Sequence, residues 1–563
     1  MKISAKDFQE SGSKYLQEIQ SSFGGGMNLQ VDIAVIEKDE YGAAFNVSNR
    51  YSDLAPLKLH QEIASSIPGK KHGIYAIGAY FVLFAGGLAY YRIENGDFIL
   101  IENFHMSTTA ERYYVAFVPA STVNTLRSLA QPNNNTAVVV NPSITISGTP
   151  QALVVQDGVS QPWILYIDGS SVKSRVTQTY EQWDSVSNNR EYVPIGTDML
   201  FTDGILFVVS ADRQSFYRSV TGRPLDFVVN VATNGYKGGD ANTTKYSPSY
   251  NRIVAIVPLS EQSFLVSTDA PYTYQITLNR DRTIFGEPTF NRSDLFNAAL
   301  TNSFSIVDLL GDVGFITYKG IRSFNATLQL KIESKNAIFS AKINRAFEYA
   351  NNVDIIQDDS CCAVEFRDYA LFSVNSTYGN VLAVFDKINQ KWASFVHDVG
   401  DVKIKQFASL MPTVNELYAI GTNDKVYQLF GSSEYAPAVV MTRDFCIDNP
   451  QFEQKIDSAR LVIKNQPDNG TMLVSVYADD LLAQVMTKQL VADVDISTYS
   501  EEFPINRGLA GLNSLLFEFR KNPKNGWRIG YILQWTGGGE LNTFLHNGEI
   551  NTPALNQAQQ TRV

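Results

Sequence analysis

A repeating pattern of short apolar runs separated by tight polar turns begins near Gly73 and continues for about 360 residues. It is clearest at 369–374, 381–386 and 391–395, where only a few polar residues separate one run from the next. The middle run is continuously apolar, as in a strand that is buried on both faces. Runs this short predict consecutive antiparallel strands joined by tight turns.

This pattern recurs in blocks, which lie at 73–101, 152–183, 199–227, 253–277, 303–330, 363–395 and 406–430. Repeated small sheets predict a β-propeller, because radial repetition leaves only short, protected strand edges. The blocks share little sequence identity, so they allow either six or seven blades, and a large β-sandwich is the alternative architecture. We therefore expect an all-β chain with a propeller over 27–435.

Irregular stretches interrupt the propeller and predict insertions at about 103–150 and 228–250. Within the first insertion, 121–130 is predicted to be a helix with Ser121 as its N-cap, followed by a polar loop at 131–136. A second short helix is predicted at 291–300. Inserted loops commonly carry function, so we expect these to meet neighbours or ligands.

The N-terminal residues 1–26 predict a short amphipathic helix. Its apolar residues follow a spacing of roughly 3.6 residues, and three consecutive glycines end it; the apolar residues are Phe8, Tyr15, Leu16 and Ile19. Such a helix has to dock on the body of the protein or on a neighbouring subunit.

Residues 436–548 predict a separate C-terminal β-sandwich. Two strand pairs support it, and we expect the first, 458–464 with 471–480, to form a long hairpin. The second pair, 514–519 with 528–535, flanks a polar turn. The polar residues 549–563 are predicted to form a flexible tail.

Composition and charge indicate a folded chain of more than one unit. Hydrophobic residues make up 44% and charged residues 18%, with 28 Tyr and 33 Phe among 563 residues, which is more than one core accommodates. The formal charge is −11. This charge disfavours tight binding of nucleic acid, since phosphate neutralisation needs clustered cations, but it is compatible with DNA that slides past.

The three cysteines, Cys361, Cys362 and Cys446, cannot build a disulfide framework, because two of them are adjacent. We expect inert, largely buried thiols in a protein that assembles in a reducing cytoplasm. The N-terminus lacks the apolar core of a secretory signal, and no run approaches the ~18 apolar residues of a membrane helix. Membrane insertion is therefore not expected.

The sequence predicts no catalytic, metal-binding or cofactor-binding residue. Its five histidines lack metal-ligand spacing and are expected to be structural or exposed; they are His60, His72, His105, His397 and His546. Nucleophile-elbow and phosphate-loop motifs are absent. The acidic pairs at 358–359 and 479–480 could supply the two carboxylates of a glycosidase, but adjacent acids diverge on a strand and are solvated in a turn.

A Gly-Gly-hydrophobic-Asn segment lies at 23–28, and an Asn-Arg-Pro sequence follows at 46–56. Both resemble the opening of phage tail nozzle proteins, also called tail tubular protein B, with Ser52 in place of the usual glycine. Later phrases at 73–92, 217–227 and 313–324 are similar to blade segments of that family. Together the phrases, in the same order, cover residues 23–395.

The resemblance implies a non-enzymatic structural virion protein in a six-fold ring at the distal end of the tail tube. Members, including the muzzle of crAss-like phages, are propellers with inserted domains that form hexamers and line the channel for DNA and ejected protein. It further implies contacts with adjacent tail proteins such as an adaptor, fibres or spikes. It implies no catalytic residue.

Two other functions stay open at this point. A polysaccharide-degrading propeller hydrolase would need a carboxylate pair. A carbohydrate-binding or receptor-binding tail adhesin would need exposed aromatic residues, for which Trp527 and Trp535 are candidates, although we expect Trp535 to lie in the core.

Overall fold

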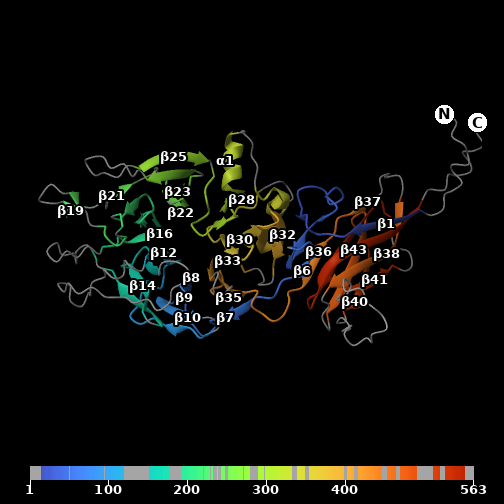
Figure 1. The fold of residues 1–563 in the computed structure, drawn as a ribbon, viewed down its shortest axis with the longest axis horizontal. Coiled ribbons are helices and arrows are strands. Elements are labelled where there is room, and N and C mark those ends of the chain that lie inside the picture. Colours follow the sequence, from blue (N-terminus) through green and yellow to red (C-terminus); the bar gives the residue numbers. More distant parts are fainter. Residues whose placement is uncertain are drawn as a thin grey trace, which may run out of the picture.

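The computed structural model describes residues 14–49, 51–93, 96–119, 151–168, 170–177, 179, 192–219, 221–222, 224–227, 230–231, 237–238, 242–246, 251–260, 262–270, 272–278, 290–296, 298–332, 339–348, 354–397, 402–410, 416–446, 453–464, 470–490, 512–519 and 526–551. Strands make up nearly all of its regular structure. The propeller and the C-terminal strands lie end to end along an elongated molecule (Figure 1).

Within these residues, seven sheets follow one another along the chain. Four of them contain β8–β11 (Lys71–Ile77, Tyr80–Ala85, Leu88–Ile93, Ile99–Leu100), β12–β15 (Tyr114–Pro119, Gln151–Gln156, Trp163–Asp168, Ser171–Val176), β16–β18 with β21 (Gly196–Thr202, Ile205–Ser210, Phe216–Arg218, Asn242–Tyr246) and β22–β25 (Ile253–Ser260, Ser263–Thr268, Thr273–Leu278, Phe290–Phe296). The others contain β26–β28 (Ile306–Asp308, Val313–Thr317, Gly320–Ser323), β29–β32 (Cys362–Phe366, Tyr369–Ser376, Gly379–Asp386, Lys391–Val396) and β33–β35 (Ile404–Leu410, Glu416–Gly421, Val426–Leu429) with β7 (Gln61–Ile63).

The seven sheets pack as the blades of a β-propeller. Their first strands are innermost: β12 contacts β16, β16 contacts β22, and β33 contacts both β29 and β8. Buried apolar clusters fill the spaces between blades, and one of them joins the last blade to the first through Tyr418 and Phe81, whose ring centroids are 4.1 Å apart. Strand β7 completes the last blade by pairing antiparallel with β35. The predicted all-β propeller is confirmed, and each predicted block matches one sheet.

The stretch at 103–150 is not wholly an insertion, because β12 within it is the innermost strand of the second blade. The helix predicted at 121–130 and the loop at 131–136 lie outside the described residues. In the stretch at 228–250, β21 is the outer strand of the third blade, and β19 (Asn230–Val231) pairs with β20 (Lys237–Gly238).

The helix predicted at 291–300 is wrong, because β25 occupies Phe290–Phe296 and pairs with β24. The open edge of β24 needs a partner for its backbone, and this tertiary demand overrides local propensity. Helices occur instead after β28, where α1 spans Phe324–Ile332 and a 3-10 helix spans Ala341–Phe347.

The C-terminal strands form a two-sheet sandwich. One sheet has the order β1 (Lys14–Gln20), β43 (Glu540–Asn551), β38 (Glu453–Lys464) and β41 (Leu512–Glu518). The facing strands are β36 (Ala438–Met441), β42 (Arg528–Trp535), β39 (Thr471–Ala478) and β40 (Leu481–Gln489), with β37 (Phe445–Cys446) beside β42. Trp535 is buried in the core between the sheets, as expected.

The predicted strands of the sandwich exist, but the hairpin predicted from 458–464 and 471–480 is wrong. Strands β38 and β39 belong to opposite sheets, and so do β41 and β42. A polar loop that crosses between sheets has the same composition as one that turns back within a sheet, so the sequence does not distinguish them.

The N-terminal helix is also wrong where the structure describes it. Residues 14–20 form β1, which pairs antiparallel with β43. Gln20 is buried and donates a hydrogen bond to the carbonyl of Glu40 at 2.9 Å, whereas Ile19 is half exposed. The predicted tail begins too early, because β43 continues to Asn551; residues 1–13 and 552–563 lie outside the described residues.

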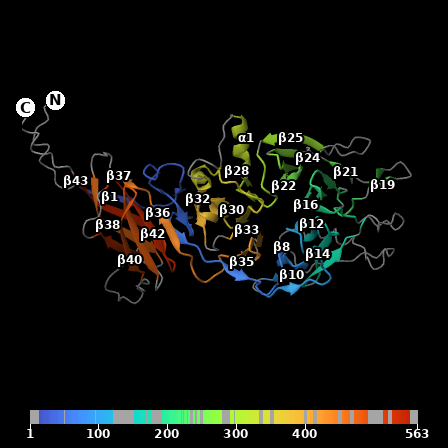
Figure 2. The ribbon, with the colours of Figure 1, turned by 180° about the vertical axis from the view of Figure 1, so that it is seen from behind.

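One sheet crosses from the propeller into the sandwich. Strand β4 (Ala44–Phe45) pairs parallel with β32 of the sixth blade and antiparallel with β36 of the sandwich, so nine strands run continuously from β29 to β40. One apolar cluster follows this sheet, from Phe372 and Trp392 in the blade to Leu533 and Phe544 in the sandwich. The short strand pairs β2–β3 (Gly26–Met27, Glu40–Tyr41) and β5–β6 (Val47–Ser48, Ala55–Pro56) flank β4 in the chain. Figure 2 shows this blue N-terminal segment between β32 and β36. The two units therefore form one body.

Asn46 stabilises the junction between the propeller and the sandwich with three hydrogen bonds. Its backbone amide donates to the carbonyl of Phe395 at 2.9 Å, its Nδ2 donates to the carbonyl of Pro437 at 3.0 Å, and its Oδ1 accepts from the amide of His397 at 3.0 Å. The residue is buried and has a φ of 59°, in the left-handed region that asparagine adopts more readily than most residues.

We predict that Asn46→Ala lowers the free energy of unfolding by about 2–4 kcal/mol, because it removes two partly buried hydrogen bonds and forces alanine into the left-handed region. Chemical denaturation followed by tryptophan fluorescence measures the loss. Asn103→Ala is the matched control, since Asn103 is exposed and has a φ of 63°. The free energy of unfolding of Asn103→Ala should fall only by the cost of placing alanine in the left-handed region, about 1–2 kcal/mol. Equal losses in the two variants would contradict the role of the side chain.

Candidate functional site

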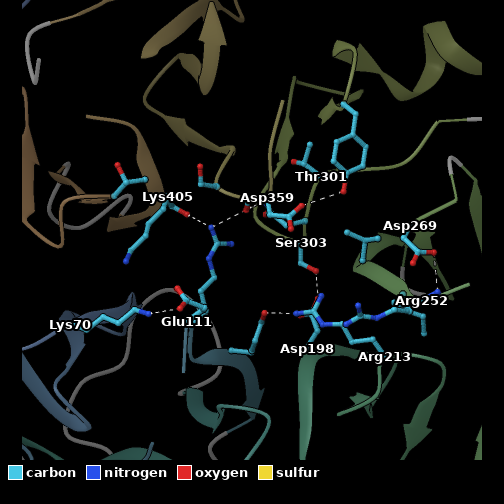
Figure 3. Close-up of a pocket in the computed structure, with 18 of the residues that line it drawn as sticks. Lys70, Glu111, Asp198, Arg213, Arg252, Asp269, Thr301, Ser303, Asp359 and Lys405 are labelled. Carbon is cyan, nitrogen blue, oxygen red and sulfur yellow. Dashed lines mark hydrogen bonds and ion pairs between the residues drawn. The ribbon is translucent and has the colours of Figure 1, made fainter. Parts of the chain in front are cut away.

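The innermost strands run in one direction, so their starts meet at one end of the propeller and surround a cavity of about 740 Å³. Turns between the second and third strands of four blades complete the wall with Arg213, Asp269, Tyr318 and Asp424. We call this cavity the axial mouth (Figure 3). Its charged residues are the cations Lys70, Arg112, Arg213, Arg252 and Lys405 and the anions Glu111, Asp198, Asp269, Asp359 and Asp424.

Chain order explains why charged side chains gather there. Lys70, Arg112 and Arg252 each stand one or two residues before an innermost strand that is rich in apolar residues. A polar residue at this place emerges from the packed ring into the open axis, where water or a ligand can solvate it. The sequence analysis missed these residues, although a charge before several apolar runs was visible in the sequence.

Two ion pairs neutralise one side of the axial mouth. Lys70 Nζ lies 2.6 Å from Glu111 Oε1, and Lys405 Nζ lies 2.9 Å from Asp424 Oδ1. The hydrogen bond from Lys70 lowers the pKa of Glu111. All four side chains are partly or largely exposed, so each pair stabilises the fold by less than about 1 kcal/mol.

The three arginines are held differently: neutral groups position the side chains of Arg112 and Arg213, and the backbone amide of Arg252 donates to the Asp269 carboxylate at 3.0 Å. Arg112 donates to the carbonyls of Asp359 at 3.3 Å and Lys405 at 2.8 Å, and its guanidinium carbon lies 4.8 Å from the ring centroid of Phe304. Arg213 donates to the hydroxyl of Tyr114 at 2.5 Å. Among the described residues, Arg112, Arg213 and Arg252 form no ion pair with a carboxylate.

Asp198 is the buried carboxyl of the axial mouth, with 6% of its surface exposed. It accepts a hydrogen bond from the amide of Met199 at 2.9 Å and another from the hydroxyl of Ser303. Burial raises the pKa of Asp198 to about 6, and the hydrogen bond from Ser303 opposes this shift only in part. A carboxyl that is half protonated near pH 6 is a candidate acid or base.

Two further groups face the axial mouth. Asp359 accepts a hydrogen bond from the hydroxyl of Tyr318 at 3.3 Å and is otherwise exposed. Thr301 is fully buried, and its Oγ1 has no hydrogen-bond partner among the described residues. A buried hydroxyl without a partner costs free energy, so a water molecule or ligand at this place would be stabilised.

The two acidic pairs that the sequence singled out lie in different surroundings, and the two carboxylates within each pair have different partners. Asp358 and Asp359 diverge: Asp358 pairs with Lys403 at 2.7 Å, whereas Asp359 lines the axial mouth. Asp479 and Asp480 lie in an exposed turn of the sandwich. They are not merely solvated, because Asp479 accepts from the amide of Arg528 at 3.0 Å and Asp480 pairs with the Arg528 guanidinium.

The predicted structural role of several other residues fits their surroundings. Cys361 and Cys362 are free and fully buried, and burial raises the pKa of the Cys361 thiol. His546 is buried against Phe445, and burial lowers the pKa of its ring to about 3. His72 stacks on Tyr113, whereas His105 is exposed.

In the described part of the chain, no three His, Cys, Asp or Glu residues are grouped as metal ligands would be. No helix there combines the length and apolar character that crossing a membrane requires.

Comparisons with known proteins find the fold only at low similarity. No family model and no curated protein matches the chain. Among solved structures, the WD40 β-propeller domain of Doa1 is 7% identical, with a TM-score of 0.36, over 67% of this chain and 97% of that one. YCF48 from Cyanidioschyzon merolae is 8% identical, with a TM-score of 0.34, over 66% of this chain and 98% of that one.

We predict that Asp198→Asn stabilises the protein at pH 8 by about 1–3 kcal/mol. The folded pKa of about 6 lies above the ordinary value of 3.8, so the wild type loses stability as pH rises from about 4 to about 6, and the amide does not. Urea unfolding of both proteins between pH 4 and pH 8 measures the difference. If the greater stability of Asp198→Asn over the wild type did not shrink towards pH 4, the result would contradict a buried ionising carboxyl.

Proposed function

We propose that this chain is a structural subunit of a bacteriophage tail, located in the virion and assembled in the host cytoplasm. In this proposal copies of the chain, six by resemblance to the nozzle family, form a ring around the channel for DNA and ejected protein. Adjacent tail proteins such as an adaptor, fibres or spikes contact the ring. The ordered phrases between residues 23 and 395 support the family, and the structure supports the mechanical part of the role.

The observation that carries the proposal is the sheet that runs from β29 through β4 to β40. It joins propeller and sandwich by backbone hydrogen bonds and a common core, so the subunit cannot bend freely between them. A ring that keeps a channel open needs wedges of this stiffness, arranged by heterologous contacts that close on themselves.

The propeller axis is not the channel in this proposal. A B-form duplex, whose major groove alone is about 12 Å wide, does not fit a cavity of about 740 Å³ among packed inner strands. DNA would instead pass between copies, along outer surfaces of an acidic chain with a formal charge of −11. Weak repulsion there favours sliding over binding.

We predict that the purified protein forms rings with a mass six times the 62.6 kDa of one chain, each with a central hole wide enough for duplex DNA. Light scattering measures the mass, and negative-stain electron microscopy shows the hole. A protein that stays monomeric at high concentration and also fails to join rings on purified tails would contradict the proposal.

A propeller hydrolase is the second candidate, favoured by the buried Asp198 carboxyl in the axial mouth. It requires turnover of a capsular polysaccharide by the wild type and loss of turnover in Asp198→Asn, whereas the structural proposal expects no turnover by either protein. Glycan binding that Trp527→Ala abolishes would indicate an adhesin instead, since Trp527 is only half buried.

A further inference from the structure

We propose that the axial mouth is a docking site for an extended acidic peptide segment of a partner protein. The proposal concerns a site apart from the channel between copies, and it does not depend on the tail assignment.

The first argument is the state of the three arginines. Carbonyl groups and the Phe304 ring hold Arg112, and the Tyr114 hydroxyl holds Arg213. These acceptors are uncharged and fix the positions of the guanidinium groups; the Asp198 carboxyl acts electrostatically on Arg213, whereas the acceptors of Arg112 leave its charge uncompensated. A fixed guanidinium with spare N–H groups binds carboxylates in bidentate fashion. Arg252 is exposed on the same wall, and its neighbour Ile253 donates an amide hydrogen bond to the Arg213 carbonyl at 2.5 Å.

The second argument selects a peptide over a polyanion. The axial mouth contains five cations and five carboxyl groups, so its formal charge is zero and nucleic acid would meet as much repulsion as attraction. A peptide offers both kinds of group: an acidic side chain for the arginines, and backbone N–H groups for exposed acceptors such as Asp269 and Asp359.

The third argument is size. A volume of about 740 Å³ lies within the range of pre-formed ligand pockets and fits a few residues of extended chain. The ends of the inner strands and the short segments next to them form the wall, and the packed strands hold these segments in place, so binding costs little ordering of the protein.

The test is a selection with random peptides of about eight residues, long enough to cross the axial mouth at about 3.3 Å per residue. The full-length protein is immobilised, and the retained peptides are sequenced. We expect Asp or Glu to be enriched at one or more positions. The most enriched peptide should bind at least about tenfold more tightly than its Gln or Asn counterpart in fluorescence anisotropy.

Matched variants locate the site. Arg252→Gln should abolish the enrichment and weaken the selected peptide at least about tenfold, and Arg112→Gln provides a second variant if its melting temperature is unchanged. Arg460→Gln removes the same charge from the exposed face of β38 in the sandwich and should leave binding unchanged.

Three results would overturn the proposal: no acidic enrichment, enrichment that persists in Arg252→Gln, or loss of binding in Arg460→Gln as well. Complete competition by millimolar glutamate or inorganic phosphate would also overturn it, since the site would then recognise a free anion rather than a peptide.

Discussion

The hydrogen bonds between β4 and its two neighbours are the interaction on which the rest of the structure depends. Strand β32 would otherwise be the outer edge of a blade, and β36 would be the edge of a sandwich sheet, each with unpaired backbone groups. Two residues of β4 and the three hydrogen bonds of Asn46 satisfy both edges at once. The N-terminal segment then continues to β7 and closes the propeller ring. One segment therefore joins the two units and also completes one of them.

This construction gives the molecule two kinds of surface. The outer surfaces of a stiff, elongated body can meet other copies without deforming, which is what a ring around a channel needs. The axial mouth is held by the ring of inner strands, so the positions of its charged groups are set before any ligand arrives. There, ion pairs neutralise some charges, and neutral acceptors hold the side chains of Arg112 and Arg213. Burial raises the pKa of Asp198 to about 6.

The blades could be predicted because each is built mostly from strands that are consecutive in the chain. Strands β30, β31 and β32 follow one another with short turns, and their apolar runs mark them directly in the sequence. Errors occurred where a strand has a distant partner. Leu16 and Ile19 fit a helical spacing, yet residues 14–20 pair with β43 more than 500 positions away. Strands β38 and β39 were found, but their assignment to opposite sheets depends on packing that a polar loop does not encode. The axial mouth was missed for the same reason, since Arg112, Arg213 and Arg252 are far apart in the chain.

The sequence by itself determined the all-β class, the repeated sheets and the burial of Cys361 and Cys362, although not of Cys446, which is half-buried. Apolar periodicity and composition act over a few residues at a time. Only the tertiary structure decided that a propeller and a sandwich share one sheet, and that three arginines whose side chains form no ion pair among the described residues meet at one end of the propeller axis. The physical reason is that closing a ring and satisfying free sheet edges are conditions on the whole chain. Any segment that supplies the backbone partner and fits the core can meet them, wherever it lies in the sequence.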